Sequence, residues 1–364
     1  MGGVLDSLLE TLDAWSLAPN LRRLWIEYRD TGFDDIFDRA GLAAFPLQIK
    51  STGNPEEEQI RVYFVNDDGK LYEFAWLGPR EWRRGNNGDP IASDVRRGTP
   101  LASVIGGVNG VETYVFYLDT DSNLRAVVGN GGGWTVGARL PVTDMADDTS
   151  LAAVTRGKRN DTIRVYYQQT SGDLKLLWFS DGGWFASGGR VLTDPRRGTK
   201  LAYVNAIERW SGNNDYSFHL FYIAEWKTSY KIIHQSDILG SDIDQKVLSP
   251  DVRPDTGLAV VAWRGSGAGE YNLRLYFADP DGEVLEYGYS SAKGWDQKAT
   301  KPSGTTSSMS KPLAAVTFSD DKGQNVQVLV KDGSAALVEM FATAVATMEK
   351  WDKPEVVNWN GLKD

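Results

Sequence analysis

A repeated pattern of short apolar segments is the feature that most constrains how this chain can fold. The motif Leu-Ala-x-Val, or a close variant, begins at Leu42, Leu101, Leu151, Leu201, Leu258 and Leu313. Successive copies start 59, 50, 50, 57 and 55 residues apart. A period of this length predicts a repeat architecture in which each copy is one supersecondary unit.

Each copy has the sequence pattern of four short strands. The copy at 151–189 contains four apolar runs rich in Val, Ile, Tyr, Phe and Trp, as half-buried strands are. Glycine-containing breaks at 171–173 and 181–183 provide the positive φ angles of hairpin turns. Because one small sheet cannot bury both of its faces, the copies must pack against each other. Six four-stranded units repeated radially indicate an all-β chain folded as a six-bladed β-propeller.

Two further signals recur with the same period. A tryptophan follows the third strand of most copies, at Trp82, Trp134, Trp184, Trp295 and Trp351. Four copies also have an aspartate seven residues and a threonine two residues before the leucine, at Asp94/Thr99, Asp144/Thr149, Asp194/Thr199 and Asp251/Thr256. We therefore expect the blades to share their turns as well as their strands.

The N-terminal segment differs from the repeats. We assign residues 39–364 to the propeller and residues 1–38 to a segment that belongs to the same domain. Leu5, Leu8, Leu9, Leu12 and Trp15 have helical spacing and predict a short amphipathic helix. Residues 21–34 have the pattern of third and fourth strands, so we expect them to add an outer strand to the C-terminal blade and close the ring.

Composition excludes several classes of function. The chain has no cysteine and only two histidines, which argues against thiolate chemistry, metal ligation and a Ser-His-Asp triad, and we expect no cofactor and no metal. A formal charge of −10 argues against a nucleic-acid partner, and no apolar run is long enough for a membrane span. The first residues lack a secretory signal pattern, which leaves a cytoplasmic location or secretion after processing open. Oligomeric state stays open as well.

The segments IRVYF…LYEF and LRLYF…VLEY resemble the six-bladed fungal fucose-specific lectins. That resemblance implies sugar sites between adjacent blades, each made by an Arg, a Glu twelve residues later and a Trp of the next blade. It assigns Arg61, Glu73 and Trp134 to the first site, and Arg274 and Glu286 to the fifth. In the fourth, His219 and Ile232 stand at the Arg and Glu positions, facing Trp295. The other copies are also altered, with Tyr114 and Ala126, Arg164 and Leu176, and Gln327 and Glu339.

So many altered sites point to a changed function. Degenerate members of this group are similar to the hetero-Diels–Alderases of fungal tropolone–sesquiterpenoid biosynthesis. This resemblance implies a secondary-metabolism cyclase that binds an apolar small molecule and promotes a pericyclic reaction by positioning and hydrogen bonding. Its catalytic side chains would be Arg274, Arg156, Trp263 and Phe318, several of them near the mouth of the central channel. The alternative is a glycan-binding lectin with one or two surviving fucose sites and a fucosylated glycan as its partner.

Overall fold

The computed structural model of this chain describes residues 42–49, 57–66, 68–76, 82–106, 112–156, 162–187, 194–210, 213–238, 244–265, 270–302, 309–320, 323–332, 337–344 and 355–356. These residues form six four-stranded antiparallel sheets. The predicted all-β propeller with six blades is confirmed. Within the described ranges the only helical segment is a 3-10 turn, η3 (Asn86–Gly88).

The strands follow one another in chain order within each blade. Blade 1 contains β1 (Leu42–Ile49), β2 (Glu57–Val65), β3 (Leu71–Trp76) and β4 (Trp82–Arg84). Blade 2 contains β5 (Ala102–Gly106), β6 (Glu112–Leu118), β7 (Leu124–Gly129) and β8 (Trp134–Val136). Blade 3 contains β9 (Ala152–Arg156), β10 (Thr162–Gln168), β11 (Leu174–Ser180) and β12 (Gly183–Ser187).

The second half of the ring repeats this order. Blade 4 contains β13 (Leu201–Trp210), β14 (Asn213–Trp226), β15 (Ser229–Ile238) and β16 (Asp244–Asp251). Blade 5 contains β17 (Ala259–Arg264), β18 (Tyr271–Ala278), β19 (Val284–Ser290) and β20 (Gly294–Trp295). Blade 6 contains β21 (Met309–Asp320), β22 (Gly323–Asp332), β23 (Leu337–Ala344) and β24 (Glu355–Val356).

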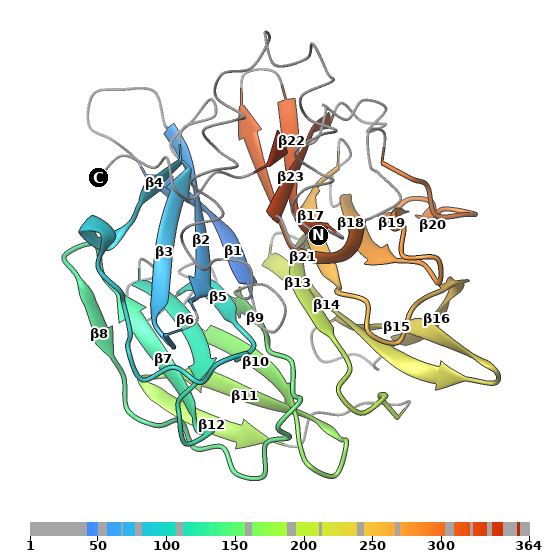
Figure 1. Cartoon of the computed structure of the whole chain (residues 1–364). Helices are drawn as coiled ribbons and strands as arrows, with labels where there is room; N and C mark the ends of the chain where they lie inside the picture. Colours follow the sequence, from blue (N-terminus) through green and yellow to red (C-terminus); the bar gives the residue numbers. More distant parts are fainter. Residues whose placement is uncertain are drawn as a thin grey trace, which may run out of the picture.

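The first strand of each blade lies innermost, and the blades surround a common axis (Figure 1). Each innermost strand contacts the innermost strands of the blades on both sides, and β21 contacts β1. The ring is therefore closed by packing between the first and last blades. In each hairpin the pairing is antiparallel and mostly regular, so residues two apart on one strand point toward the same neighbouring blade.

The hydrophobic core lies between the blades rather than within them. One cluster joins blades 2 and 3 and contains Phe116, Ile163 and Leu177, all fully buried. A second joins blades 4 and 5 and includes Phe221 and Leu273. Because each sheet is one layer thick, its apolar faces become buried only against the neighbouring sheets. This requirement explains why the sequence consists of repeated units, since each unit needs its neighbours to bury its apolar faces.

The repeated threonine anchors blades 2 to 5 to the linkers that precede them. Its Oγ1 accepts a hydrogen bond from a buried backbone N–H near the end of the blade's second strand. The donor–acceptor distances are 2.7 Å for Leu118 to Thr99, 2.8 Å for Gln168 to Thr149, 2.7 Å for Ile223 to Thr199 and 2.6 Å for Ala278 to Thr256. The same hydroxyl donates to the carbonyl of the following residue, as at Thr256 with Gly257, 3.0 Å away. The motif recurs with the period of the blades because it joins linker and blade in the same way in these four copies.

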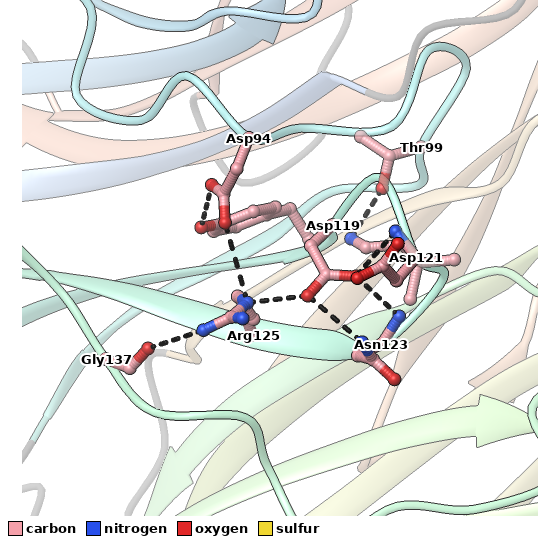
Figure 2. Close-up of polar contacts among 9 residues, drawn as sticks. Asp94, Thr99, Asp119, Asp121, Asn123, Arg125 and Gly137 are labelled. Carbon is pink, nitrogen blue, oxygen red and sulfur yellow. Dashed lines mark hydrogen bonds and ion pairs between the residues drawn. The ribbon is translucent and has the colours of Figure 1, made fainter.

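The repeated aspartate has a structural role in blade 2. Asp94 accepts a hydrogen bond from the Tyr117 hydroxyl at 2.9 Å, and its other oxygen lies 3.5 Å from Nε of Arg125 (Figure 2). Arg125 Nε also donates to Asp119 at 2.6 Å, and Asn123 donates to the same carboxylate. Burial opposes ionisation of Asp119, but these donors outweigh it and lower its pKa. This network joins the linker to the β6–β7 hairpin.

Some expectations fall on residues outside the described ranges. The predicted N-terminal helix and the strand expected from residues 21–34 lie there, and so do the boundary at residue 38 and Trp351. In blade 6 the strand that pairs with the outer side of β23 is β24, from the C-terminal segment. Among the described residues, no helix is long and apolar enough to cross a membrane.

Replacing Thr256 with Val tests the threonine anchor. Valine preserves the shape but removes the acceptor for the buried N–H of Ala278, so we expect unfolding free energy to fall by about 1–3 kcal/mol. Urea unfolding measures the loss. Thr256→Ser, which keeps a hydroxyl, should retain most of the stability. Equal midpoints for the valine and serine variants would contradict the assigned role.

Candidate functional site

The two surviving Arg–Glu pairs have the same geometry. On blade 1, Arg61 lies opposite Ala75 and Tyr63 lies opposite Glu73. Arg61 and Glu73 are therefore diagonal neighbours on one face of the β2–β3 hairpin. On blade 5, Arg274 and Glu286 have the same relation through β18 and β19. We number the interblade sites by the blade that provides this hairpin, so the first lies between blades 1 and 2 and the fifth between blades 5 and 6.

The structure brings all three predicted residues of the first site together. Nη1 of Arg61 lies 3.8 Å from Oε1 of Glu73, which also accepts a hydrogen bond from the Tyr63 hydroxyl at 3.0 Å. Trp134 of blade 2 lies near Glu73, whose carboxyl pKa it lowers, and it meets the Tyr63 ring edge-on at a centroid distance of 5.8 Å. Contacts from two blades thus hold this carboxylate in place.

The environment of Glu73 raises its pKa overall. The side chain is buried, and burial raises its pKa above the ordinary value. Arg61, Tyr63 and Trp134 each lower the pKa, but together they offset only part of the burial effect. The glutamate is thus a buried acceptor whose charge depends on its donors. A ligand hydroxyl that donates a hydrogen bond to it would further stabilise its charged form.

The fifth site combines the surviving pair with a residue predicted for the channel mouth. Nε of Arg274 lies 3.5 Å from Oε1 of Glu286, and Tyr276 donates to the other carboxylate oxygen at 2.9 Å. The guanidinium of Arg274 lies 5.2 Å from the centre of the Trp263 ring. Trp263 therefore belongs to the same cluster as Arg274. Burial raises the pKa of Glu286, and nearby Arg274 offsets part of that shift.

The fourth site required a correction. Ile232 lies opposite Ile223, whereas His234 lies opposite Phe221, two residues beyond His219. His234 therefore occupies the glutamate position, because the β14–β15 hairpin puts it fifteen residues after His219 instead of twelve. The assignment of Ile232 to this position was wrong. Measuring back from the tight turn at Lys227, which has a positive φ of 57°, would have identified the shift.

The two histidines form a buried hydrogen-bond chain with Trp295 of blade 5. The indole Nε1 of Trp295 lies 3.3 Å from Nδ1 of His234, and Nε2 of His234 lies 2.9 Å from Nδ1 of His219. His219 Nε2 then lies 2.8 Å from the hydroxyl oxygen of Ser217. Because the indole only donates, each ring accepts at Nδ1 and donates from Nε2. An additional proton anywhere in this chain would place two donors face to face.

Aromatic rings surround this chain. The Trp295 ring packs edge-on against Phe221 and His234, and it stacks on Tyr287 at 5.0 Å. Side chains of the protein itself therefore occupy the fourth site. Burial lowers the pKa of His219 to about 3. The pKa of His234 also lies well below its ordinary value, chiefly through burial and then through the charges of His219 and Lys246.

The remaining sites lack the Arg–Glu pair. In the second, Tyr114 lies near Trp184 of blade 3, with centroids 6.4 Å apart, and Ala126 is at the glutamate position. In the third, the guanidinium of Arg164 lies over the Phe218 ring of blade 4, 4.2 Å from its centre. The side chains of Arg156, Phe318 and Glu339 are outside the described part. Among described residues, no group of three or more metal-ligating side chains is arranged to hold an ion.

Comparison with known proteins agrees with this architecture. The family model of the fungal fucose-specific lectins matches residues 36–353. The chain belongs to this family. No curated protein sequence matched it.

Solved structures of lectins have the same fold as this family member. The lectin of Aleuria aurantia, described as a six-bladed β-propeller, is 22% identical, with 89% of this chain and 97% of that chain covered and a TM-score of 0.67. AofleA from Arthrobotrys oligospora is 19% identical, covering 90% and 88%, with a TM-score of 0.67. BP39L from Burkholderia pseudomallei is 16% identical, covering 87% and 84%, with a TM-score of 0.62. At these identities the likeness shows the fold alone.

The histidine chain predicts how the stability of this fucose-specific lectin family member depends on pH. Because the folded-state pKa values of His219 and His234 lie below 6.5, the unfolded chain binds more protons between about pH 6.5 and about pH 3. The two histidines therefore make their full contribution to the free energy of unfolding above pH 6.5. This contribution should fall as the pH is lowered, by about 1.4 kcal/mol per pH unit for each histidine. Urea unfolding over this range measures the trend.

A second measurement separates the histidines from the carboxyls. The raised pKa values of Glu73 and Glu286 act in the opposite direction, since the folded protein then binds more protons near their titration. Nitrogen-15 NMR of the imidazole rings should show both histidines neutral, with the proton on Nε2, at pH about 5. Titration of either ring near 6.5 in the folded protein would contradict the predicted chain.

Proposed function

We propose that this protein is a glycan-binding lectin that recognises fucosylated glycans through one or two interblade sites. The observation that supports this proposal most directly is the first site, where Arg61 and Glu73 of blade 1 lie together with Trp134 of blade 2. Membership of the fungal fucose-specific lectin family supports it as well.

The chemistry of the first site suits a deoxy sugar. Arg61 presents a planar fork of donors, and Glu73 presents acceptors to paired hydroxyls. The Trp134 indole, which lies near Glu73, offers an apolar surface for the sugar's C–H groups. Tyr63 orients the carboxylate by donating to it, so the acceptor has little freedom before ligand binding. A preorganised acceptor reduces the entropic cost of association.

The number of sites limits the binding strength of one molecule. Of the described sites, only the first and the fifth carry an Arg–Glu pair, and the fourth is filled by the His219–His234 chain. A lectin gains avidity when several weak sites bind one multivalent glycan together. We therefore expect weak binding of a monovalent fucoside and little gain from additional copies on the same ligand.

The cyclase interpretation stays a prediction. Two of its four residues, Arg274 and Trp263, do lie together. However, Glu286 pairs with the guanidinium at 3.5 Å, so the cluster contains opposite charges, whereas an apolar substrate would favour apolar walls. The family match names a lectin, which favours glycan binding over the cyclisation of an apolar substrate.

Titration with methyl α-L-fucoside tests the proposed function. We expect calorimetry to give at most two sites per chain. Arg61→Ala should abolish binding at the first site, since removing a charged donor to a desolvated hydroxyl costs about 1.5–3 kcal/mol. Arg61→Lys should recover only part of the affinity because lysine lacks the planar fork.

The exposed Arg139 provides the matched control. Arg139→Ala makes the same change of charge outside the first site, so its titration should equal that of the unmodified protein. A count of four or more equivalent sites would contradict the proposed site assignment. Absence of any fucoside binding would reject the proposed function.

A further inference from the structure

The fifth interblade site contains a carboxylate that sequence analysis did not identify. Asp296 follows Trp295 at the outer edge of blade 5, where it lies over Gly288 and near Arg274. A Cβ added to Gly288 would collide with Oδ2 of Asp296 and would lie 3.0 Å from Nη1 of Arg274. Asp296 and Arg274 therefore share the space that a side chain at position 288 would fill.

The backbone holds Asp296 in this place. Its N–H donates to the carbonyl of Gly288 at 2.9 Å, and its own carbonyl accepts from the Tyr287 hydroxyl at 2.9 Å. The side chain is exposed. In the part of the chain that the structure describes, no group donates a hydrogen bond to its carboxylate and no cation pairs with it.

Arg274 is already engaged by other groups. Its Nη1 donates to the carbonyl of Leu273 at 2.9 Å, and Glu286 lies 3.5 Å from its Nε. Trp263 packs against the guanidinium. The arginine therefore balances the charge of Glu286, and the carboxylate of Asp296 adds a second negative charge to the same site.

The two surviving sites thus differ in charge. One cation and two carboxylates give the fifth site a net charge of −1, counting Arg274, Glu286 and Asp296. In the first site Arg61 and Glu73 sum to zero. Ala75 holds the position of Gly288 there, and the outer-strand residue paired with it is Arg83 rather than an acidic residue.

We propose that the fifth interblade site binds a sugar that carries a protonated amino group, a hexosamine with a free amine, and that Asp296 selects it. This inference rests on the proposed lectin function. An ammonium group offers three donors and neutralises the net charge of the site. Hydrogen bonds between charged partners are also stronger than those a neutral hydroxyl makes. A neutral deoxy sugar would leave Asp296 uncompensated and therefore suits the first site better.

A matched pair of ligands tests the inference. Methyl glucosaminide carries an ammonium group at pH about 6, whereas its N-acetyl derivative is neutral. At ~0.01 M salt, where charges are weakly screened, we expect the amine to bind roughly five- to tenfold more tightly. The indole N–H resonance of Trp263, assigned with Trp263→Phe, reports binding at the fifth site. The indole N–H resonance of Trp134 reports binding at the first site.

Variants of the fifth site distinguish the effect of the Asp296 charge from the effect of its position. Asp296→Asn removes the charge and should abolish the preference for the amine. Gly288→Ala should also reduce it, because the new Cβ forces the carboxylate away from Arg274. Asp281→Asn is the control, since it removes an exposed carboxylate at the β18–β19 turn of the same blade and should keep the preference.

Two results would overturn the inference: equal affinity for the two glucosaminides, or a preference that survives Asp296→Asn. Failure of the lectin proposal would give a different result. In that case methyl α-L-fucoside would leave the Trp134 resonance unchanged, regardless of whether the Trp263 resonance shifts. Absence of any response of Trp263 to the amino sugar counts against the inference even if fucoside binds at the first site.

Discussion

Apolar contact between facing blades is the interaction on which the rest of this structure depends. A single four-stranded sheet has two apolar faces, and each can be buried only against another sheet. The cluster of Phe116, Ile163 and Leu177 across blades 2 and 3 shows this arrangement. Burying each such side chain contributes about 1.5–3 kcal/mol. Because the first four interblade sites take residues from both partners, this packing also sets the distances within them.

The same hairpin positions carry different chemistry around the ring. The first and fifth sites place an Arg–Glu pair there, whereas the fourth places His219 and His234. The backbone pairing of the strands does not depend on these side chains, so they can change without loss of the blade. Each solution still gives its buried carboxylate or imidazole groups hydrogen-bond partners. The glutamates accept from a tyrosine and face an arginine, and the histidines stay neutral within an ordered hydrogen-bond chain.

Local spacing predicted the candidate sites well only where the hairpins have equal length. The family's spacing of twelve residues assigned Arg61 and Glu73, and the structure places their side chains 3.8 Å apart. The same rule failed at Ile232, because three additional residues in the β14–β15 hairpin move His234 into that position. Strand alternation has a period of two, and any change in hairpin length alters which residue faces the neighbouring blade.

The sequence by itself determined the number of blades, their four-strand pattern and the threonine that anchors four of the linkers, because these features repeat and depend on local periodicity. Only the tertiary structure decided which distant residues meet. It placed Trp263 against Arg274, directed the Trp295 indole at His234 of the preceding blade, and set Asp296 in the space above Gly288. These contacts join side chains whose positions depend on hairpin register, on the absence of a Cβ and on the packing of one sheet against another. None of these is encoded in the spacing of residues along one strand.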